Sequence, residues 1–166
     1  QLWKRGLRGH VYASPAQLSD GTLIQPATDG TIYALEPETG RVLWAHDTLG
    51  PIRSSPAVDA KDRIYVGTGE GRLVALDPDG TLRWTYRCID EERNDLNASP
   101  ALGPDGIAIA GENGGVFLVP WDYPLSPDGR ADPRVTLGPG EALPPDGVFL
   151  LYTSAFGALH AEPPRA

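Results

Sequence analysis

The chain has 166 residues with 20 glycines, 17 prolines, one cysteine and a formal charge of −8. Because glycine and proline disfavour helix interiors, this composition excludes a helical bundle. The single cysteine, Cys88, excludes a disulfide framework and a thiolate zinc site within one chain, and the 40% hydrophobic fraction excludes a disordered chain. The chain is acidic and lacks the basic stripe that binding to nucleic acid requires. Its longest apolar runs, about five residues, are far too short to span a membrane.

The first predicted element is a short strand at residues 2–4, which contains Trp3. Trp44 and Trp84 follow it at intervals of 41 and 40 residues. Residues 2–4 are therefore expected to be the last strand of a repeat copy whose earlier strands are not in the sequence.

Charge is uneven along the chain, because residues 1–10 carry three basic groups and no acidic one, whereas residues 101–166 carry 3 basic and 8 acidic groups.

The rest of the chain repeats with a period of about 40 residues, which is typical of repeat architectures. A Ser-Pro-Ala motif starts three of the copies, and a turn follows five residues after each proline. The copies cover about residues 12–46, 54–87, 98–137 and 140–163. In the second copy, four strands are predicted, at residues 54–58, 63–67, 72–77 and 81–86. Four short strands in each copy indicate the blades of an all-β, antiparallel β-propeller.

The third and fourth copies are less regular than the first two. In the third copy, three clear strands are predicted, followed by a long insertion and a further strand at residues 134–137. In the fourth copy, strands are predicted near residues 141–143, 148–152 and 158–161. The fourth copy then lacks its outer strand, which the strand at residues 2–4 is expected to supply, closing residues 1–166 into a monomeric four-bladed ring. The alternative is one half of an eight-bladed ring that is completed by a second chain or by further sequence.

The first two copies share a specific motif. Residues 29–44 and 70–84 align with a single deletion, and both contain Ala-Leu, an acidic residue, proline, and a glycine followed four residues later by tryptophan. This motif resembles the repeat of the pyrroloquinoline-quinone-like (PQQ-like) β-propellers. The resemblance implies that Trp3, Trp44 and Trp84 dock between neighbouring blades. WD40 repeats have the same period but close each blade with Trp-Asp, which neither Trp44 nor Trp84 does.

Some members of this family are quinoprotein dehydrogenases, and the resemblance implies for those members a calcium-bridged quinone and a catalytic aspartate. This chain has no Asp-x-Asp-x-Asp-Gly cluster for calcium, and no nucleophile elbow, phosphate loop or dinucleotide motif. Its three histidines, His10, His46 and His160, lack the spacing of metal ligands. The sequence therefore predicts a protein that is not an enzyme, with no catalytic residues, no cofactor and no metal.

Two irregular segments are the candidates for partner binding, since a repeat uses its regular positions for packing and its insertions for function. The connection at residues 87–97 is acidic, and Arg53 lies in the equivalent preceding connection. The segment 120–139 places aromatic residues among prolines. The predicted contact residues of both segments are Arg53, Asp90, Glu91, Glu92, Asp95, Trp121 and Tyr123. The alternatives are a solvated loop for the first segment and a cover over a blade edge for the second.

These observations favour a non-catalytic PQQ-like propeller that binds or assembles proteins. The family resemblance places it outside the cytoplasm of a bacterium, as a periplasmic, outer-membrane-associated or secreted protein. Two alternatives remain open at this point. One is a fragment or relic of a PQQ-dependent dehydrogenase, and the other is the extracellular sensor domain of a membrane receptor or kinase.

Overall fold

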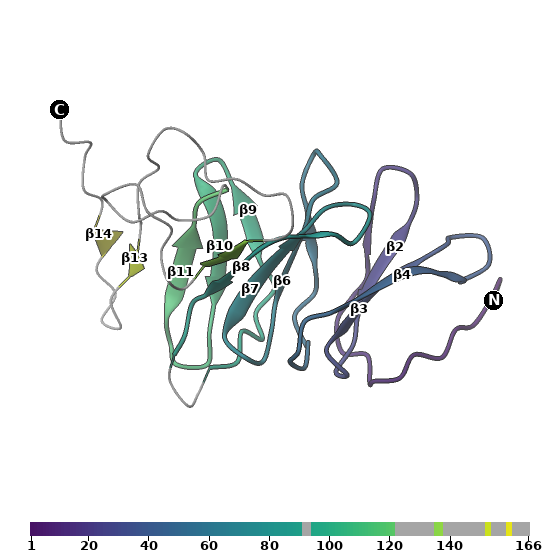
Figure 1. Ribbon diagram of the computed structural model, residues 1–166, viewed down its shortest axis with the longest axis horizontal. Helices are drawn as coiled ribbons and strands as arrows, with labels where there is room; N and C mark the ends of the chain where they lie inside the picture. The colour runs from purple at the N-terminus through teal and green to yellow at the C-terminus, as the bar shows by residue number, and fades with distance from the viewer. Residues whose placement is uncertain (91–93, 122–134, 138–151, 154–158, 161–166) are drawn as a thin grey trace.

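The structure is a computed structural model that describes residues 1–90, 94–121, 135–137, 152–153 and 159–160. These residues contain fourteen β-strands and no helix, which confirms the all-β prediction. No helix among them is long and apolar enough to cross a membrane. The strands form successive antiparallel sheets that follow one another in chain order (Figure 1).

The first sheet contains four strands in the order β1-β2-β3-β4. Tight turns that use glycine or aspartate separate the strands, so that each strand pairs with the one before it. A register shift between Ala34 and Leu35 interrupts the pairing of the last two strands. The bounds of the strands are β1 Ala16–Gln17, β2 Leu23–Pro26, β3 Thr31–Leu35 and β4 Val42–Asp47.

The second sheet repeats the first almost residue for residue. Ala75 pairs with Trp84 as Ala34 pairs with Trp44, and the register shift falls directly after Ala75 as it does after Ala34. Its strands match the four predicted for the second copy to within three residues at each end. They are β5 Ala57–Val58, β6 Ile64–Gly67, β7 Arg72–Leu76 and β8 Leu82–Arg87.

The third sheet contains β9 (Ala101–Gly103), β10 (Gly106–Ala110) and β11 (Val116–Val119) in the order β11-β10-β9. The strand predicted at residues 134–137 is present as β12 (Val135–Leu137), but it pairs antiparallel with β8 of the second sheet. Its assignment as the fourth strand of the third copy is therefore wrong. The insertion before β12 is long enough to reach the edge of β8, and any open edge offers the same backbone groups for pairing.

The predicted closure by the N-terminal strand is also wrong. Residues 2–4 form no strand, and they lie against the first sheet rather than against the last one. The last two strands, β13 (Tyr152–Thr153) and β14 (Leu159–His160), pair with each other. Figure 1 shows them at the opposite end of the molecule from the N-terminus. The strands predicted near residues 141–143 lie outside the described residues.

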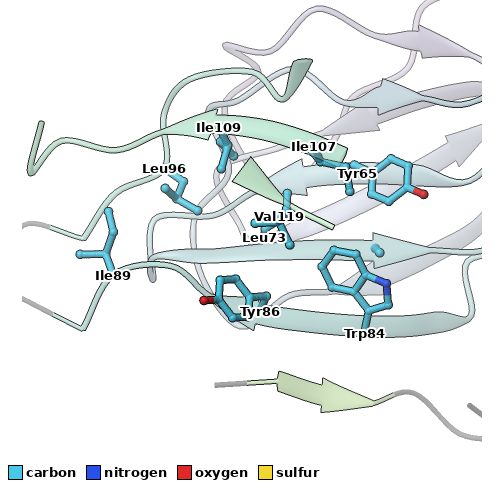
Figure 2. Close-up of a cluster of buried hydrophobic side chains, with 10 residues drawn as sticks. Tyr65, Leu73, Trp84, Tyr86, Ile89, Leu96, Ile107, Ile109 and Val119 are labelled. Atoms are coloured by element: carbon cyan, nitrogen blue, oxygen red, sulfur yellow. The ribbon is translucent and has the colours of Figure 1, made fainter. Parts of the chain in front are cut away.

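Two buried apolar clusters lie between neighbouring sheets. The first joins Ile24 and Ile32 of the first sheet to Ile64 and Val66 of the second. The second joins Tyr65, Leu73 and Trp84 of the second sheet to Ile107 and Ile109 of the third, and Figure 2 shows these side chains converging between the strands. Alternate residues of the strands in the second sheet thus face opposite neighbours, so that this sheet is buried on both faces.

Candidate functional site

Trp3 and Trp44 dock in the same way on successive sheets. The indole Nε1 of Trp3 donates to the carbonyl of Pro37 at 2.8 Å, and that of Trp44 donates to the carbonyl of Pro78 at 3.0 Å. Each ring lies on the glycine of the same turn, where a Cβ atom would meet the ring at 2.4 Å at Gly40 and 2.6 Å at Gly80. Only glycine leaves room there, and it also accepts the positive φ of the turn.

Trp84 lies in a different environment. It is fully buried in the cluster between the second and third sheets, with its ring 6.2 Å from that of Tyr65. Its Nε1 is buried and has no hydrogen-bond partner among the described residues. Trp121 stands at the register position that Pro78 holds in the second sheet. The third sheet thus replaces the proline of the docking turn with a second tryptophan.

Trp121 itself is turned onto the second sheet. Its ring meets Tyr65 edge-on at 5.8 Å, the Arg63 guanidinium lies 5.9 Å from its ring centre, and its Nε1 donates to the carbonyl of Pro104 at 3.2 Å. This half-buried ring covers part of the boundary between the sheets. Tyr123, predicted beside it, lies outside the described residues.

A charged cluster that was not predicted from the sequence lies beneath Trp121. Arg63 Nε lies 2.5 Å from Asp59 Oδ2, with these side chains 16% and 8% exposed, and the Tyr65 hydroxyl donates to the same oxygen at 3.2 Å. Burial acts to raise the pKa of Asp59, but the hydrogen bonds from the Arg63 backbone and side chain hold it below its usual value. The available signal was a break in the repeat, since Leu18 and Gly103 occupy the position of Asp59 in the other copies.

The predicted polar contact residues gather where the connections between sheets cross the hairpin turns. Arg53 Nη1 donates to Asp95 Oδ2 at 3.0 Å, so that the structure brings these two predicted residues together across successive connections. Backbone bonds fix both connections: Gly69 N donates to Pro51 O at 2.7 Å, and Leu96 N donates to Thr68 O at 3.0 Å. We call residues 49–54, 68–71, 88–90, 94–97 and 111–114 the connection face.

The rest of the predicted acidic group is more dispersed. Asp90 is exposed and lies 3.4 Å from Arg87 Nη1. Asn97 Nδ2 donates to Glu112 Oε1 at 2.9 Å, which ties the connection to the turn of the third sheet. Glu91 and Glu92 lie outside the described residues. The part of the connection that the structure describes therefore presents paired charges on a backbone held at several points.

A ladder of serines links the three sheets beside this face. Ser14 N donates to Ser55 Oγ at 2.9 Å, and Ser55 N donates to Ser99 Oγ at 3.0 Å. The Ser-Pro-Ala motif marks the start of the first three copies in the sequence, but these bonds between copies were not predicted from it. They hold the starts of neighbouring sheets together and so fix the relative positions of the connections.

The connection face offers charged and polar side chains that can contact a partner. Within the described ranges, no group of three His, Cys, Asp or Glu side chains comes together to hold a metal ion. Asp90 and Asp95 each face an arginine. Ion pairs at a half-exposed surface can exchange partners at little cost, which suits binding to a charged protein surface.

A comparison with known families identifies a match over residues 1–124 to the family described as outer membrane protein assembly factor BamB. Among curated proteins, BamB of Moranella endobia is 30% identical over 127 residues, covering 70% of this chain and 32% of that protein. The quinoprotein alcohol dehydrogenase PedH of Pseudomonas putida is 29% identical over 112 residues, covering 61% of this chain and 19% of that protein. The chain thus spans a third or less of these relatives.

Solved structures give the same fold. The crystal structure of BamB from Moraxella catarrhalis aligns with a TM-score of 0.61 at 24% identity, covering 72% of this chain and 40% of that one. The quinohemoprotein alcohol dehydrogenase from Comamonas testosteroni aligns with a TM-score of 0.56 at 20% identity, covering 68% and 19%. Both confirm the predicted β-propeller fold, and the family match confirms the predicted PQQ-like repeats.

Proposed function

This chain belongs to the family of the outer membrane protein assembly factor BamB, and on that premise we propose that it is a non-catalytic propeller that binds or assembles other proteins. The proposal includes an extracytoplasmic location, since the related protein of Moranella endobia is named as an outer membrane protein assembly factor. The partner is a protein that offers a charged surface to the connection face.

The Arg53–Asp95 ion pair carries this proposal. It joins two successive connections at 3.0 Å on a half-exposed surface, and the backbone beneath it is fixed by hydrogen bonds to the turns of the second and third sheets. A preorganised polar surface loses little conformational entropy on binding. Because this surface is formed by connections rather than by strands, its amino-acid sequence can change without disturbing the sheets.

The donor set does not fit the calcium-bridged quinone that the sequence resemblance implies for quinoprotein dehydrogenases. That group needs several oxygen ligands converging on one cation, and the described acidic side chains are instead spread over separate ion pairs. No step of chemistry through a quinone is therefore assigned to this chain.

Photo-crosslinking tests the binding face. A benzoylphenylalanine placed at Asp90, which is exposed on the connection face, should form a covalent adduct with a protein partner in cells that express the intact protein. The matched control is Asp79, which is exposed in the turn between β7 and β8. Asp95→Lys should lower the adduct yield at position 90, whereas Asp79→Lys should not. Equal adducts at both positions, or none at position 90, would contradict the proposal.

A dehydrogenase remains the second candidate, because PedH and the quinoprotein ethanol dehydrogenases match a large part of this chain. Titration with pyrroloquinoline quinone and calcium separates the two functions. We expect no change in the melting temperature or in the quinone absorbance. A saturable rise in melting temperature would favour the dehydrogenase, since a ligand that binds the native state stabilises it.

A further inference from the structure

The strand β12 shows how the outer edge of a sheet in this chain takes a further strand. It pairs antiparallel with three residues of β8, and Thr136 pairs with the middle one, Thr85. Cys88 N, at the end of the same ladder, donates to Gly71 O at 2.8 Å. Because hydrogen-bonded and non-hydrogen-bonded pairs alternate along an antiparallel ladder, Thr85 directs its backbone N–H and C=O away from β7 and toward β12.

The strand β4 is the equivalent of β8 in the first sheet, and in the described part of the chain it is the last strand of its sheet. Thr48 N donates to Gly30 O at 2.8 Å, so the same alternation directs the backbone groups of Ala45 and Asp47 away from β3. Ala45 is the equivalent of Thr85, since each directly follows the tryptophan of its strand. The edge of β4 therefore offers the backbone groups that face β12 on β8.

The side chains of β4 leave this edge accessible. Val42 and Leu43 are 36% and 43% exposed, and Leu43 stands where β8 has Arg83. The strand contains no proline or lysine, which are residues that commonly protect a sheet edge from the addition of a strand. The register shift in this sheet is no obstacle, because β8 has the same shift and β12 pairs with the residues beyond it.

Two side chains of β4 define the chemistry of a strand that would fit. Asp47 is exposed, and its Oδ1 accepts a hydrogen bond from Leu49 N at 2.8 Å. No basic side chain of the described residues forms an ion pair with it, so a basic residue opposite it gives a favourable cross-strand pair. Ala45 is small and exposed, which leaves room opposite it for a β-branched or aromatic side chain.

We propose that the outer edge of β4, at residues 44–47, binds an extended segment of another protein, which adds to the first sheet as an antiparallel strand in the register that β12 takes on β8. The segment carries a basic residue two positions before a β-branched or aromatic residue. The β12 strand of this chain is already paired with β8, so the added strand comes from a different protein. The proposal rests on the proposed function only in that the partner is a protein, and it assigns a second surface apart from the connection face.

Hydrogen exchange followed by NMR on the full chain tests this edge. The probe is a synthetic peptide of residues 131–139 of this chain, because its Arg134 and Thr136 have the required spacing. At saturating peptide, the amides of Ala45 and Asp47 should exchange at least about fivefold more slowly, while the amides of β7 stay unchanged.

The matched control is the same peptide with proline in place of Thr136, which removes the central backbone donor of the added strand. This peptide should leave the exchange of Ala45 and Asp47 unchanged. Unchanged exchange with the first peptide, or equal slowing with both peptides, would overturn the proposal.

A pair of variants tests the same edge from the side of the protein. Proline is tolerated in an edge strand where its nitrogen faces outward, so Ala45→Pro should fold and lose at least about 10-fold in affinity for the labelled peptide, measured by fluorescence polarisation. Ala45→Thr introduces the residue that β8 has at this position, and it should bind as the wild type does. Equal affinity of the two variants would overturn the proposal, and the exchange measurement on the wild type does not depend on either variant folding.

A concentration series without peptide separates the possible sources of the strand. The exchange of Ala45 and Asp47 should not depend on the concentration of the chain. Slower exchange at higher concentration would assign the edge to a second copy and would overturn the choice of another protein. Failure of these tests leaves the crosslinking test of the connection face untouched, since that face contains no residue of β4.

Discussion

At the scale of the residue, the repeat works through pairs in which a tryptophan needs a glycine. Trp44 lies against Gly80, which has a φ of +85°. Gly114 has nearly the same φ of +82°, but nothing lies within 4 Å of the position that its Cβ would take. Gly114 therefore meets only the backbone requirement of its turn, whereas Gly80 also leaves the space that the docked ring needs.

Gly80→Ala should destabilise the protein more than Gly114→Ala. Both changes force a side chain into the left-handed region, at about 1 kcal/mol each, but only the first pushes Trp44 off its turn. We expect a loss of about 2–3 kcal/mol at Gly80, measured by urea unfolding and accompanied by a change in tryptophan fluorescence. Equal losses for the two variants would show that the ring contact contributes nothing.

The buried Asp59 predicts a dependence of stability on pH. Its folded-state pKa lies below the usual 3.8, so the unfolded chain binds more protons in acid, and the contribution of Asp59 is present above pH 4 and is lost as the pH falls through the folded pKa. Asp59→Asn leaves Arg63 unpaired and should cost about 3 kcal/mol at pH 7. In urea unfolding at pH 7, 5 and 3, the gap to the wild type should narrow toward pH 3, and a constant gap would contradict this.

At the scale of the element, each connection contributes an apolar residue to the contact between two sheets. Ile52 lies in the connection between β4 and β5, yet its side chain is buried among Ile24, Ile32 and Ile64. The hydrogen bond from Ile52 N to Ala27 O at 3.3 Å ties it to the first sheet. The connections are thus part of the core as well as carriers of the binding face.

Ile52→Ala should therefore destabilise the protein by about 2–4 kcal/mol, since it leaves a cavity where two sheets meet. The control is Leu49→Ala three residues earlier in the same connection, where the exposed side chain predicts a change within about 0.5 kcal/mol. Chemical denaturation followed by circular dichroism measures both. A small effect at Ile52 would mean that the two sheets pack without it.

Local patterns predicted most of the strands. The four strands of the second copy could be located because proline, glycine and aspartate turns bound short apolar runs, and neighbours in sequence then pair. The partner of β12 could not be predicted, because an open strand edge accepts any extended segment within reach, and the choice of β8 depends on distances in the folded chain.

The candidate site residues show the same contrast between what local sequence patterns predict and what only the folded chain determines. The meeting of Arg53 and Asp95 follows from their places in successive connections of a repeat, which periodicity reveals. The cluster of Asp59, Arg63 and Tyr65 breaks the repeat, and its members are brought together by the pairing of β5 and β6 with Trp121 above them. A search for repeated features passes over such a cluster.

At the scale of the whole molecule, the first three sheets form a series in which each buries a face of the one before. The clusters that join the first sheet to the second and the second to the third share no member. Stability in such an array is a sum of contacts between neighbours. The family match over residues 1–124 covers this regular part. The repeat in this part allowed the fold to be predicted from the sequence, whereas it did not determine the number of blades in the ring.

The constant separation of 34 residues between each docked indole and its acceptor also has a meaning for synthesis on the ribosome. Trp44 is synthesised before the carbonyl that it will bind, and at cellular elongation rates the interval is roughly two to seven seconds. The indoles of Trp3 and Trp44 therefore have no acceptor during that interval. Slow codons between positions 44 and 78 would lengthen the interval, and we expect them to lower the yield of native protein.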